Sequence, residues 1–362
     1  MKRFVVDRAA LGNNIEILKN RAGTATVFGV IKGNGYGLGV TNLADVLREH
    51  GVDHFAVTDL NEVFRLRRGG FEQETILMME GTCNPHELSA LIENRAIVTV
   101  GSFACAERLD AEAKARGVIA EAHIKIDTGM GRFGFLPQEI QQVLSLYESF
   151  PNIRFSGIYT HFCKAFDKAA TKEMFERFQT VVQAITHAGQ NPGLVHCCNS
   201  TAFWNYPEMH CGAVRIGSAL LGRVNFPGET GLVRIGRCEA EIEDIRTLPM
   251  GHAVGYGSHW VAKRETRTAV LPIGYSHGFS VEKGYDLWGA KDCIHGVGRY
   301  VKAFLKKKAL YVTVNGKPCR VLGHVGMVNM VIDVTDCKAE VGDMAVVDIN
   351  PLVLKDVPVV LS

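Results

Sequence analysis

The sequence predicts an α/β protein in which a (β/α)₈ barrel over residues 1–230 is followed by an all-β domain over residues 231–362. Two observations predict this division. Up to about residue 225, short apolar runs bounded by Gly, Asn or Asp alternate with longer stretches of helical period. From Leu232 onward, β-rich runs and turn signals replace the helical stretches. A doubly wound parallel sheet gives a similar periodicity and stays open as the alternative to a barrel.

The first part of the chain contains eight apolar runs of the length expected for parallel strands buried on both faces. Helices are expected between them, with Thr41, Asp59 and Ser102 as N-caps. The predicted strands are Thr26–Ile31, His54–Thr58, Thr75–Met79, Ala96–Val100, Ala122–Asp127, Arg154–His161, Gly193–Cys198 and Ala213–Gly217, and the predicted helices are Leu43–His50, Leu60–Arg68, Ala104–Ala115, Pro137–Tyr147 and Ala169–His187.

The second part is expected to contain only strands and turns. Tyr311–Val314 reads as a strand, and Asn315-Gly316 suits a type I′ hairpin turn because both central residues of that turn need positive φ. Val331–Val334 and Met344–Ile349 are further predicted strands. The run Lys306-Lys307-Lys308 is expected to be a solvated face.

Charge and composition exclude several classes of protein. The 362 residues carry 40 Lys+Arg and 38 Asp+Glu, which leaves no strong field for a nucleic acid or an anionic membrane, so neither partner is expected. No apolar run approaches the roughly 18 residues that cross a bilayer, and a cytoplasmic location is the default. Ten cysteines without a C-x-x-C pair predict reduced thiols and no metal site. Even Cys197 and Cys198, beside His196, would point to opposite faces of a strand.

A glycine-rich segment, Lys32–Gly39, follows the first predicted strand directly. Its glycines do not match the dinucleotide-binding pattern G-x-G-x-x-G. One interpretation is a flexible turn with a solvated lysine and a packed tyrosine. The other is an active site, since these lie at the carboxyl ends of barrel strands, and a partly desolvated lysine forms Schiff bases.

Polar residues recur at the ends of later predicted strands. The segment Lys125–Gly134 places Lys125, Asp127 and Arg132 there, either as an ion-pair network at the barrel rim or with Arg132 as a carboxylate-binding group. Small residues after the seventh and eighth strands suit a phosphate held by backbone N–H groups. The remaining polar segments are Thr160-His161-Phe162, Cys198–Thr201 and Arg215–Ser218.

Taken together, these segments resemble the alanine racemase family of pyridoxal-phosphate enzymes. The family's lysine motif, V-K-A-N-A-Y-G-H-G, corresponds to Ile31–Gly39 here, with the Lys-x-x-x-Tyr spacing kept. The resemblance implies a barrel that binds pyridoxal 5′-phosphate, followed by a β-domain. The other matching segments are K-I-D-T-G-M-G-R at 125–132, T-H-F at 160–162, N-S at 199–200, V-R-x-G at 214–217, V-G-Y-G at 254–257, I-G-Y at 273–275 and H-V-G-M at 324–327.

The resemblance also implies a role for each matching residue. Lys32 would bind the cofactor covalently, and Lys32 and Tyr256 would be the two acid/base groups on opposite faces of the substrate. Arg215 would hydrogen-bond the pyridine nitrogen, with His161 near Tyr256 and in contact with Arg215. A homodimer follows, because the family's tyrosine base and methionine turn reach the site from the neighbouring subunit. The phosphate contacts would be Tyr36, Asn199, Ser200, Gly217 and Ser218, and the substrate-binding residues Arg132, Met327 and Tyr275.

Three departures from the family pattern leave the substrate open. Val328 stands where the family has an aspartate, Ile216 where it has a proline, and Pro351 where it has a tyrosine that narrows the side-chain pocket. Alanine is the first expectation, with serine or a larger amino acid such as lysine, arginine or ornithine as rivals. A non-catalytic carrier of pyridoxal phosphate is a further alternative. An amino-acid decarboxylase is disfavoured because the acid-binding cysteine loop of that class is not found.

Overall fold

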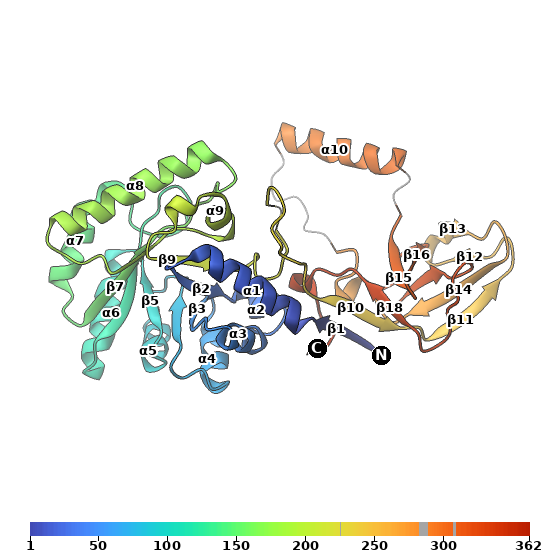
Figure 1. Ribbon diagram of the computed structural model, residues 1–362, viewed down its shortest axis with the longest axis horizontal. Helices are drawn as coiled ribbons and strands as arrows, with labels where there is room; N and C mark the ends of the chain where they lie inside the picture. Colours follow the sequence, from blue (N-terminus) through green and yellow to red (C-terminus); the bar gives the residue numbers. More distant parts are fainter. Residues whose placement is uncertain (225, 282–288, 307–308) are drawn as a thin grey trace. The chain divides into compact units, whose positions relative to one another are not determined.

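The structure is a computed structural model that describes residues 1–224, 226–281, 289–306 and 309–362 (Figure 1). The chain forms two compact units. The barrel unit is Asp7–Ile235, and the sheet unit combines Met1–Val6 with Gly236–Ser362. Lys307 and Lys308, two of the three lysines predicted to form a solvated face, lie outside the described residues.

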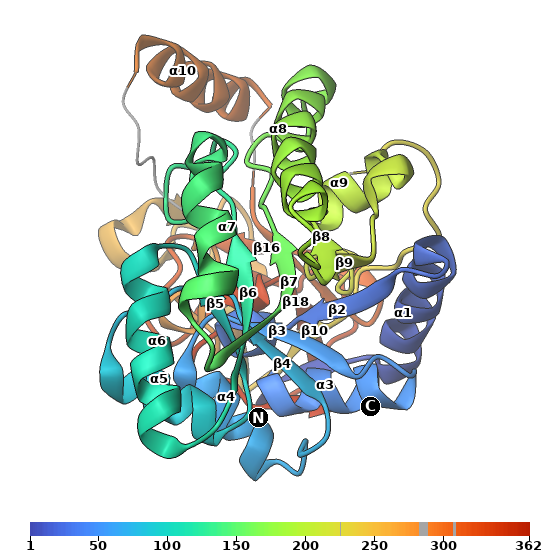
Figure 2. The same cartoon turned by 90° about the vertical axis from the view of Figure 1, so that its left-hand side faces the viewer.

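Eight parallel strands of the barrel unit close on themselves in chain order, which confirms the predicted barrel over a doubly wound sheet. Figure 2 shows the helices on the outside of these strands. Closure brings the carboxyl ends of all eight strands to one end of the barrel. The strands are β2 (Thr26–Val30), β3 (His54–Val57), β4 (Thr75–Met78), β5 (Ile97–Val100), β6 (Ala120–Lys125), β7 (Ile153–Tyr159), β8 (Leu194–His196) and β9 (Ala213–Ile216).

Helix boundaries follow local capping chemistry. Asp59 and Ser102 cap their helices as predicted, by accepting from the backbone N–H groups of Asn61 and Cys105. The prediction for Thr41 is wrong, because the helix begins at Val40, after a glycine-rich turn. The helices of the barrel unit are α1 (Arg8–Ala22), α3 (Val40–Glu49), α4 (Leu60–Arg68), α5 (Pro85–Glu93), α6 (Phe103–Arg116), α7 (Ile140–Ser149), α8 (Lys168–His187) and α9 (Ser200–Asn205), together with the short segment α2 (Lys32–Tyr36).

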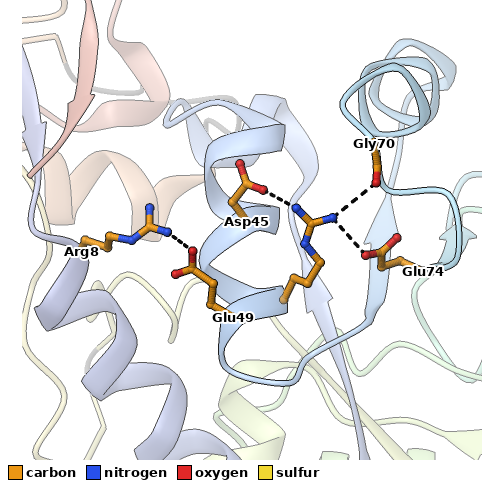
Figure 3. A network of polar contacts seen from close by, with 6 residues as sticks. Arg8, Asp45, Glu49, Gly70 and Glu74 are labelled. Carbon is orange, nitrogen blue, oxygen red and sulfur yellow. Dashed lines mark hydrogen bonds and ion pairs between the residues drawn. The ribbon is translucent and has the colours of Figure 1, made fainter.

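Helix α3 shows what holds the outer layer to the barrel. Its buried face carries Leu43, Val46 and Leu47, and full burial of each such side chain contributes about 1.5–3 kcal/mol. On its exposed face, Arg48 contacts Asp45, Gly70 and Glu74, and Arg8 pairs with Glu49 (Figure 3). Exposed ion pairs of this kind contribute only about 0–1 kcal/mol each. The apolar face, not the polar network, therefore fixes the helix on the barrel.

The N-terminal strand does not belong to the barrel unit, which corrects the predicted boundary of 1–230. Strand β1 (Lys2–Val6) pairs antiparallel with β10 (Arg237–Glu241) and parallel with β19 (Val359–Leu361). Phe4 of β1 is fully buried, and a Cβ atom at Gly236 would lie 2.4 Å from its ring. The Phe4 ring thus packs β1 against Gly236, where the chain returns from the barrel unit to the sheet unit.

The sheet unit is built on nine strands in the order β11-β14-β17-β16-β15-β18-β10-β1-β19. The predicted hairpin is confirmed: β15 and β16 are joined by Asn315 and Gly316, with φ values of 48° and 76°. The unit was expected to be all-β, yet it also contains one long helix, α10 (Ala290–Leu305). The remaining strands are β11 (Asp244–Leu248), β12 (Ala253–Val254), β13 (Trp260–Val261), β14 (Thr266–Leu271), β15 (Tyr311–Val314), β16 (Lys317–Leu322), β17 (Met330–Asp333) and β18 (Met344–Val347).

Truncating Phe4 should weaken the sheet unit. Phe4→Ala removes a fully buried ring, and the free energy of unfolding should fall by about 3–5 kcal/mol. The matched control is Phe166→Ala, because Phe166 is 80% exposed and its loss should change stability by less than about 0.5 kcal/mol. Chemical denaturation followed by circular dichroism measures both. Equal effects of the two substitutions would contradict the assignment of β1 to the sheet core.

Candidate active site

One cavity of about 220 Å³ opens at the carboxyl end of the barrel. The cavity is lined by residues at or just after the ends of several strands. The lining includes all the residues between positions 32 and 218 that the sequence analysis predicted to form the site. Those residues are Lys32 and Tyr36 after β2, Arg132 after β6, His161 after β7, Asn199 and Ser200 after β8, and Arg215, Gly217 and Ser218 at and after β9.

Lys32 begins a left-handed turn, α2. Gly33, Asn34 and Gly35 have φ values of 62°, 53° and 63°, a conformation that costs residues with a Cβ atom about 1–2 kcal/mol each. Two glycines in this turn therefore reduce its strain. The turn is held by backbone hydrogen bonds from Gly35 to Ile31 (2.8 Å) and from Gly39 to Asn34 (2.9 Å). The structure thus replaces the flexible turn that was one interpretation of this segment with a hydrogen-bonded one.

A buried carboxylate, Glu62 of α4, braces the same turn. Its Oε1 atom accepts from the backbone N–H of Asn34 at 2.8 Å, and its Oε2 atom accepts from the N–H of Thr58, at the end of β3, at 3.0 Å. Sequence reasoning missed this residue. Asp59 and Glu62 have the spacing of a capping box, which could have marked Glu62 as a partner of backbone N–H groups, although not of those in a distant turn.

Arg215 lies inside the barrel, fully enclosed by backbone and imidazole acceptors. Its Nη2 atom donates to the carbonyl of Thr160 at 2.7 Å, and its Nη1 atom donates to Nδ1 of His196 at 2.9 Å. Because arginine can only donate, Nδ1 of His196 must accept, and the proton of that ring sits on Nε2. His196 Nε2 in turn donates to Nδ1 of His123 at 3.0 Å. The sequence singled out Arg215 but neither histidine as its support.

The histidines around Arg215 are kept neutral. Burial, together with the nearby guanidinium, lowers the pKa of His123 to about 4 and that of His161 to about 3, and it lowers the pKa of His196 well below its usual value. Burial also raises the pKa of Tyr159 to about 12. The fixed positive charge at this end of the barrel therefore comes from arginine and lysine and not from imidazolium.

The three charged residues at and after the end of β6, Lys125, Asp127 and Arg132, make different contacts. The Asp127 carboxylate accepts from the backbone N–H groups of Gly129, Met130 and Arg132, which outweigh the effect of burial and lower its pKa. The Lys125 amine donates to the carbonyl of Ile126 at 2.8 Å, and burial beside Arg215 lowers its pKa to about 7. Across the described residues no ion pair joins Lys125 to Asp127, so that part of the rim-network interpretation is wrong. Arg132 faces the cavity, 3.6 Å from Glu80.

The end of the cavity near β9 is shaped to hold a small anion close to the backbone. Ser200 begins α9, and its hydroxyl oxygen accepts from the N–H of Gly217 at 3.0 Å. A Cβ atom at Gly217 would lie 2.1 Å from the Tyr36 hydroxyl, so only glycine permits this approach. With its oxygen accepting from Gly217 N–H, the Ser200 hydroxyl can donate its own proton to a phosphate oxygen, as can the Tyr36 hydroxyl.

The charge of the cavity lining also favours an anionic ligand. The cavity is lined by four side chains that can be cationic and by no Asp or Glu among the described residues: Lys32, Lys125, Arg132 and Arg215. A site with this charge favours ligands that carry phosphate or carboxylate groups. Over the same described residues, no cluster of three or more His, Cys, Asp or Glu side chains could hold a metal ion.

The other predicted site residues lie in the sheet unit. Tyr256 is 81% exposed in a short turn (Tyr256–Ser258), and Tyr275 and Met327 are also exposed. Two backbone hydrogen bonds of 3.0 Å, from Tyr275 to Gly326 and from Ser276 to Met327, bring the tyrosine and methionine segments side by side. Tyr256 and Gly326 line one hollow on this unit.

Mild acid should destabilise the barrel unit through its buried histidines. His123 and His196 are neutral in the folded chain but regain a pKa near 6.5 on unfolding. The free energy of unfolding therefore keeps its full value above about pH 6.5. Below that pH it falls by about 1.4 kcal/mol per pH unit for each histidine. For His123 the fall ends at about pH 4, which is its pKa in the folded chain. Urea denaturation at pH 7.0 and 5.5 measures the fall. His123→Asn should make it shallower, and the exposed control His86→Asn should not; an unchanged pH dependence in His123→Asn would contradict the assignment.

Comparison with known proteins identifies the family. Residues 6–224 match the family model "Alanine racemase, N-terminal domain" and residues 235–351 match "Alanine racemase, C-terminal domain". Among similar proteins, alanine racemase of Staphylococcus carnosus is 32% identical over 90% of this chain and 79% of its own, and that of Desulforamulus reducens is 30% identical over 96% and 88%. The crystal structure of alanine racemase from Streptomyces lavendulae, at 25% identity, superposes with a TM-score of 0.85 over 100% of this chain and 97% of its own. The chain belongs to the alanine racemase family.

Proposed function

We propose that this protein is a pyridoxal-phosphate-dependent racemase that interconverts L- and D-alanine. The observation that carries the proposal is the cavity of the barrel unit, where Lys32 lies at a strand end among cationic side chains and the hydroxyl groups of Tyr36 and Ser200 lie beside Gly217. The names of the relatives, alanine racemase, supply the substrate.

The residues present fit pyridoxal 5′-phosphate. The Tyr36 hydroxyl, Ser200 and the backbone at Gly217 and Ser218 would hold the phosphate, with Asn199 positioning α9 by accepting from Ala202 N–H at 3.0 Å. Lys32 would hold the cofactor covalently. When bound, the cofactor withdraws electrons from the substrate's α-carbon and so makes the α-proton acidic.

Arg215 would limit how strongly the cofactor withdraws electrons. Its guanidinium is held in place by Thr160 and His196 and effectively never gives up its proton. Arg215 would donate to the ring nitrogen of the cofactor without transferring its proton, and so would favour proton transfer at the substrate over decarboxylation or transamination.

Two bases are needed for racemisation, one on each face of the α-carbon. We assign Lys32 Nζ to one face and the Tyr256 hydroxyl to the other, each removing the proton from one enantiomer and returning it to the opposite one. A phenol needs cationic surroundings to act near neutral pH. Because His161 is neutral, Arg215 and its neighbouring lysines must supply that charge.

The second base would come from another copy of the chain. Exposure of Tyr256, Tyr275 and Met327 on adjoining segments of the sheet unit supports a shared site in a homodimer. Arg132, the Met327 backbone and Tyr275 would bind the substrate's carboxylate. Pro351, which is buried and begins a short turn (Pro351–Val353), stands where the family has a pocket-narrowing tyrosine, so serine, lysine, arginine and ornithine remain candidate substrates. A cytoplasmic location also stays a prediction.

Hydrogen exchange tests the reaction directly. The purified protein with pyridoxal phosphate is incubated in D₂O with L-alanine, L-serine, L-lysine, L-arginine or L-ornithine. Deuterium should enter the α-position of alanine, together with the D-enantiomer, as seen by NMR and chiral chromatography. Exchange restricted to another amino acid would overturn alanine as the substrate. A bound cofactor with no exchange on any substrate would favour the carrier.

Replacing the second base separates a racemase from a carrier. Tyr256→Phe should lower kcat for racemisation by about 10²–10⁴-fold in at least one direction, because proton transfer by a positioned side chain contributes that much. Tyr311→Phe is the matched control, since Tyr311 is an exposed tyrosine on β15 of the same unit. Equal activity of the two variants would contradict the role of Tyr256, whereas unchanged cofactor binding in both would show that the site is intact.

A further inference from the structure

Helix α10 of the sheet unit turns its apolar face to solvent. Ile294, Val297, Tyr300, Val301 and Phe304 recur at three- and four-residue spacing, which places them on one side of the helix. Ile294 is 70% exposed and Phe304 82% exposed. Leu305 extends the same face.

This orientation is the reverse of that in the barrel helices. In α3 and α8, the apolar residues at helical spacing are the buried ones, for example Leu43 and Leu47 in α3 and Phe178 in α8. Among the described positions of α10, Gly296 is buried and Ala303 is half-buried. The exposed Ile, Val, Tyr, Phe and Leu side chains of α10 thus form an apolar surface on one side of the helix, and exposed apolar surfaces of this kind mark interaction sites.

The charged residues in and after α10 indicate which kind of partner its apolar surface binds. In the sequence, residues 290–308 contain six Lys or Arg and one acidic residue, whereas the whole chain has nearly equal numbers of each. Lys302 follows the apolar face at its edge, and Lys306 follows the helix end; both are exposed. A helix with aromatic and aliphatic residues on one face and cations beside them has the composition of helices that lie in the interface of an anionic bilayer.

We propose that α10 binds the surface of an anionic lipid bilayer, with Ile294, Val297, Tyr300, Val301 and Phe304 among the acyl chains and Lys302 and Lys306 at the headgroups. The helix would lie along the bilayer and not cross it. Among the described residues, no helix has the length and apolar character to span a membrane. Each cation near such a surface is attracted within a Debye length, so the interaction is local and does not require a charged protein. It depends on α10 alone and not on the proposed racemase activity.

Vesicle co-sedimentation of the full-length protein tests the proposal. The protein should pellet with vesicles of equal parts phosphatidylcholine and phosphatidylglycerol, bind vesicles of phosphatidylcholine alone less, and be released by high salt. Replacing two apolar residues, as Ile294→Asp with Phe304→Asp, should weaken binding at least about tenfold. Val341→Asp is the control for the apolar variant, because Val341 is equally an exposed apolar residue of the sheet unit outside α10.

A second pair of variants tests the charge. Lys302→Glu with Lys306→Glu should weaken binding to the anionic vesicles, and Lys302→Arg with Lys306→Arg should preserve it. Circular dichroism confirms that each variant is folded. Absence of binding by the unmodified protein, or equal binding by the apolar variant and its control, would overturn the proposal. If Ile294→Asp with Phe304→Asp instead changes the oligomeric state in light scattering without any vesicle binding, the face covers a second copy of the chain, and the lipid proposal is wrong.

Discussion

The burial of the Arg215 guanidinium inside the barrel is the constraint on which the site depends. An enclosed positive charge is costly unless its donors find acceptors, and here the carbonyl of Thr160 and the imidazole of His196 accept from its two Nη atoms. This arrangement imposes the tautomer of His196 and, through it, the hydrogen bond to His123. The same charge acts with burial to depress the pKa values of His161 and Lys125. Burial is the larger cause of each of these pKa shifts, and the charge of Arg215 adds to it.

Rigid attachment of Lys32 is the second requirement. Lys32, which we propose holds the cofactor, is carried by a turn whose left-handed conformation is maintained by glycines and by the Glu62 carboxylate. Since Glu62 also binds the end of β3, the turn is tied to the barrel wall and not only to its own strand. In the proposed mechanism, this bracing would keep the Lys32 amine within the small positional tolerance that proton transfer allows.

Much of the fold follows from the sequence because buried parallel strands leave a strong apolar signal. All eight barrel strands lie within a few residues of their predicted positions, and the polar strand ends meet in one cavity. What sequence reasoning missed depends on long-range packing. Strand β1 looks like any short apolar strand, and only its pairing with β10 and β19 assigns it to the sheet. In the sequence, Glu62 resembles an ordinary helix-capping residue, and its contact with the distant turn at Asn34 is visible only in the structure. The spacing of the apolar residues in α10 likewise does not reveal which face of the helix is covered.

The position of β1 constrains the order in which a growing chain can fold. The strand at residues 2–6 needs β10 (Arg237–Glu241) and β19 (Val359–Leu361) as neighbours, and both are synthesised after the whole barrel. The whole barrel, by contrast, is encoded between β1 and β10 and has all of its strands once residue 216 has been synthesised. During translation, which adds about 5–20 residues per second, the barrel can therefore close before β10 and β19, the strands that pair with β1, have been synthesised. The nine-stranded sheet can be completed only after residues 359–361 have been synthesised.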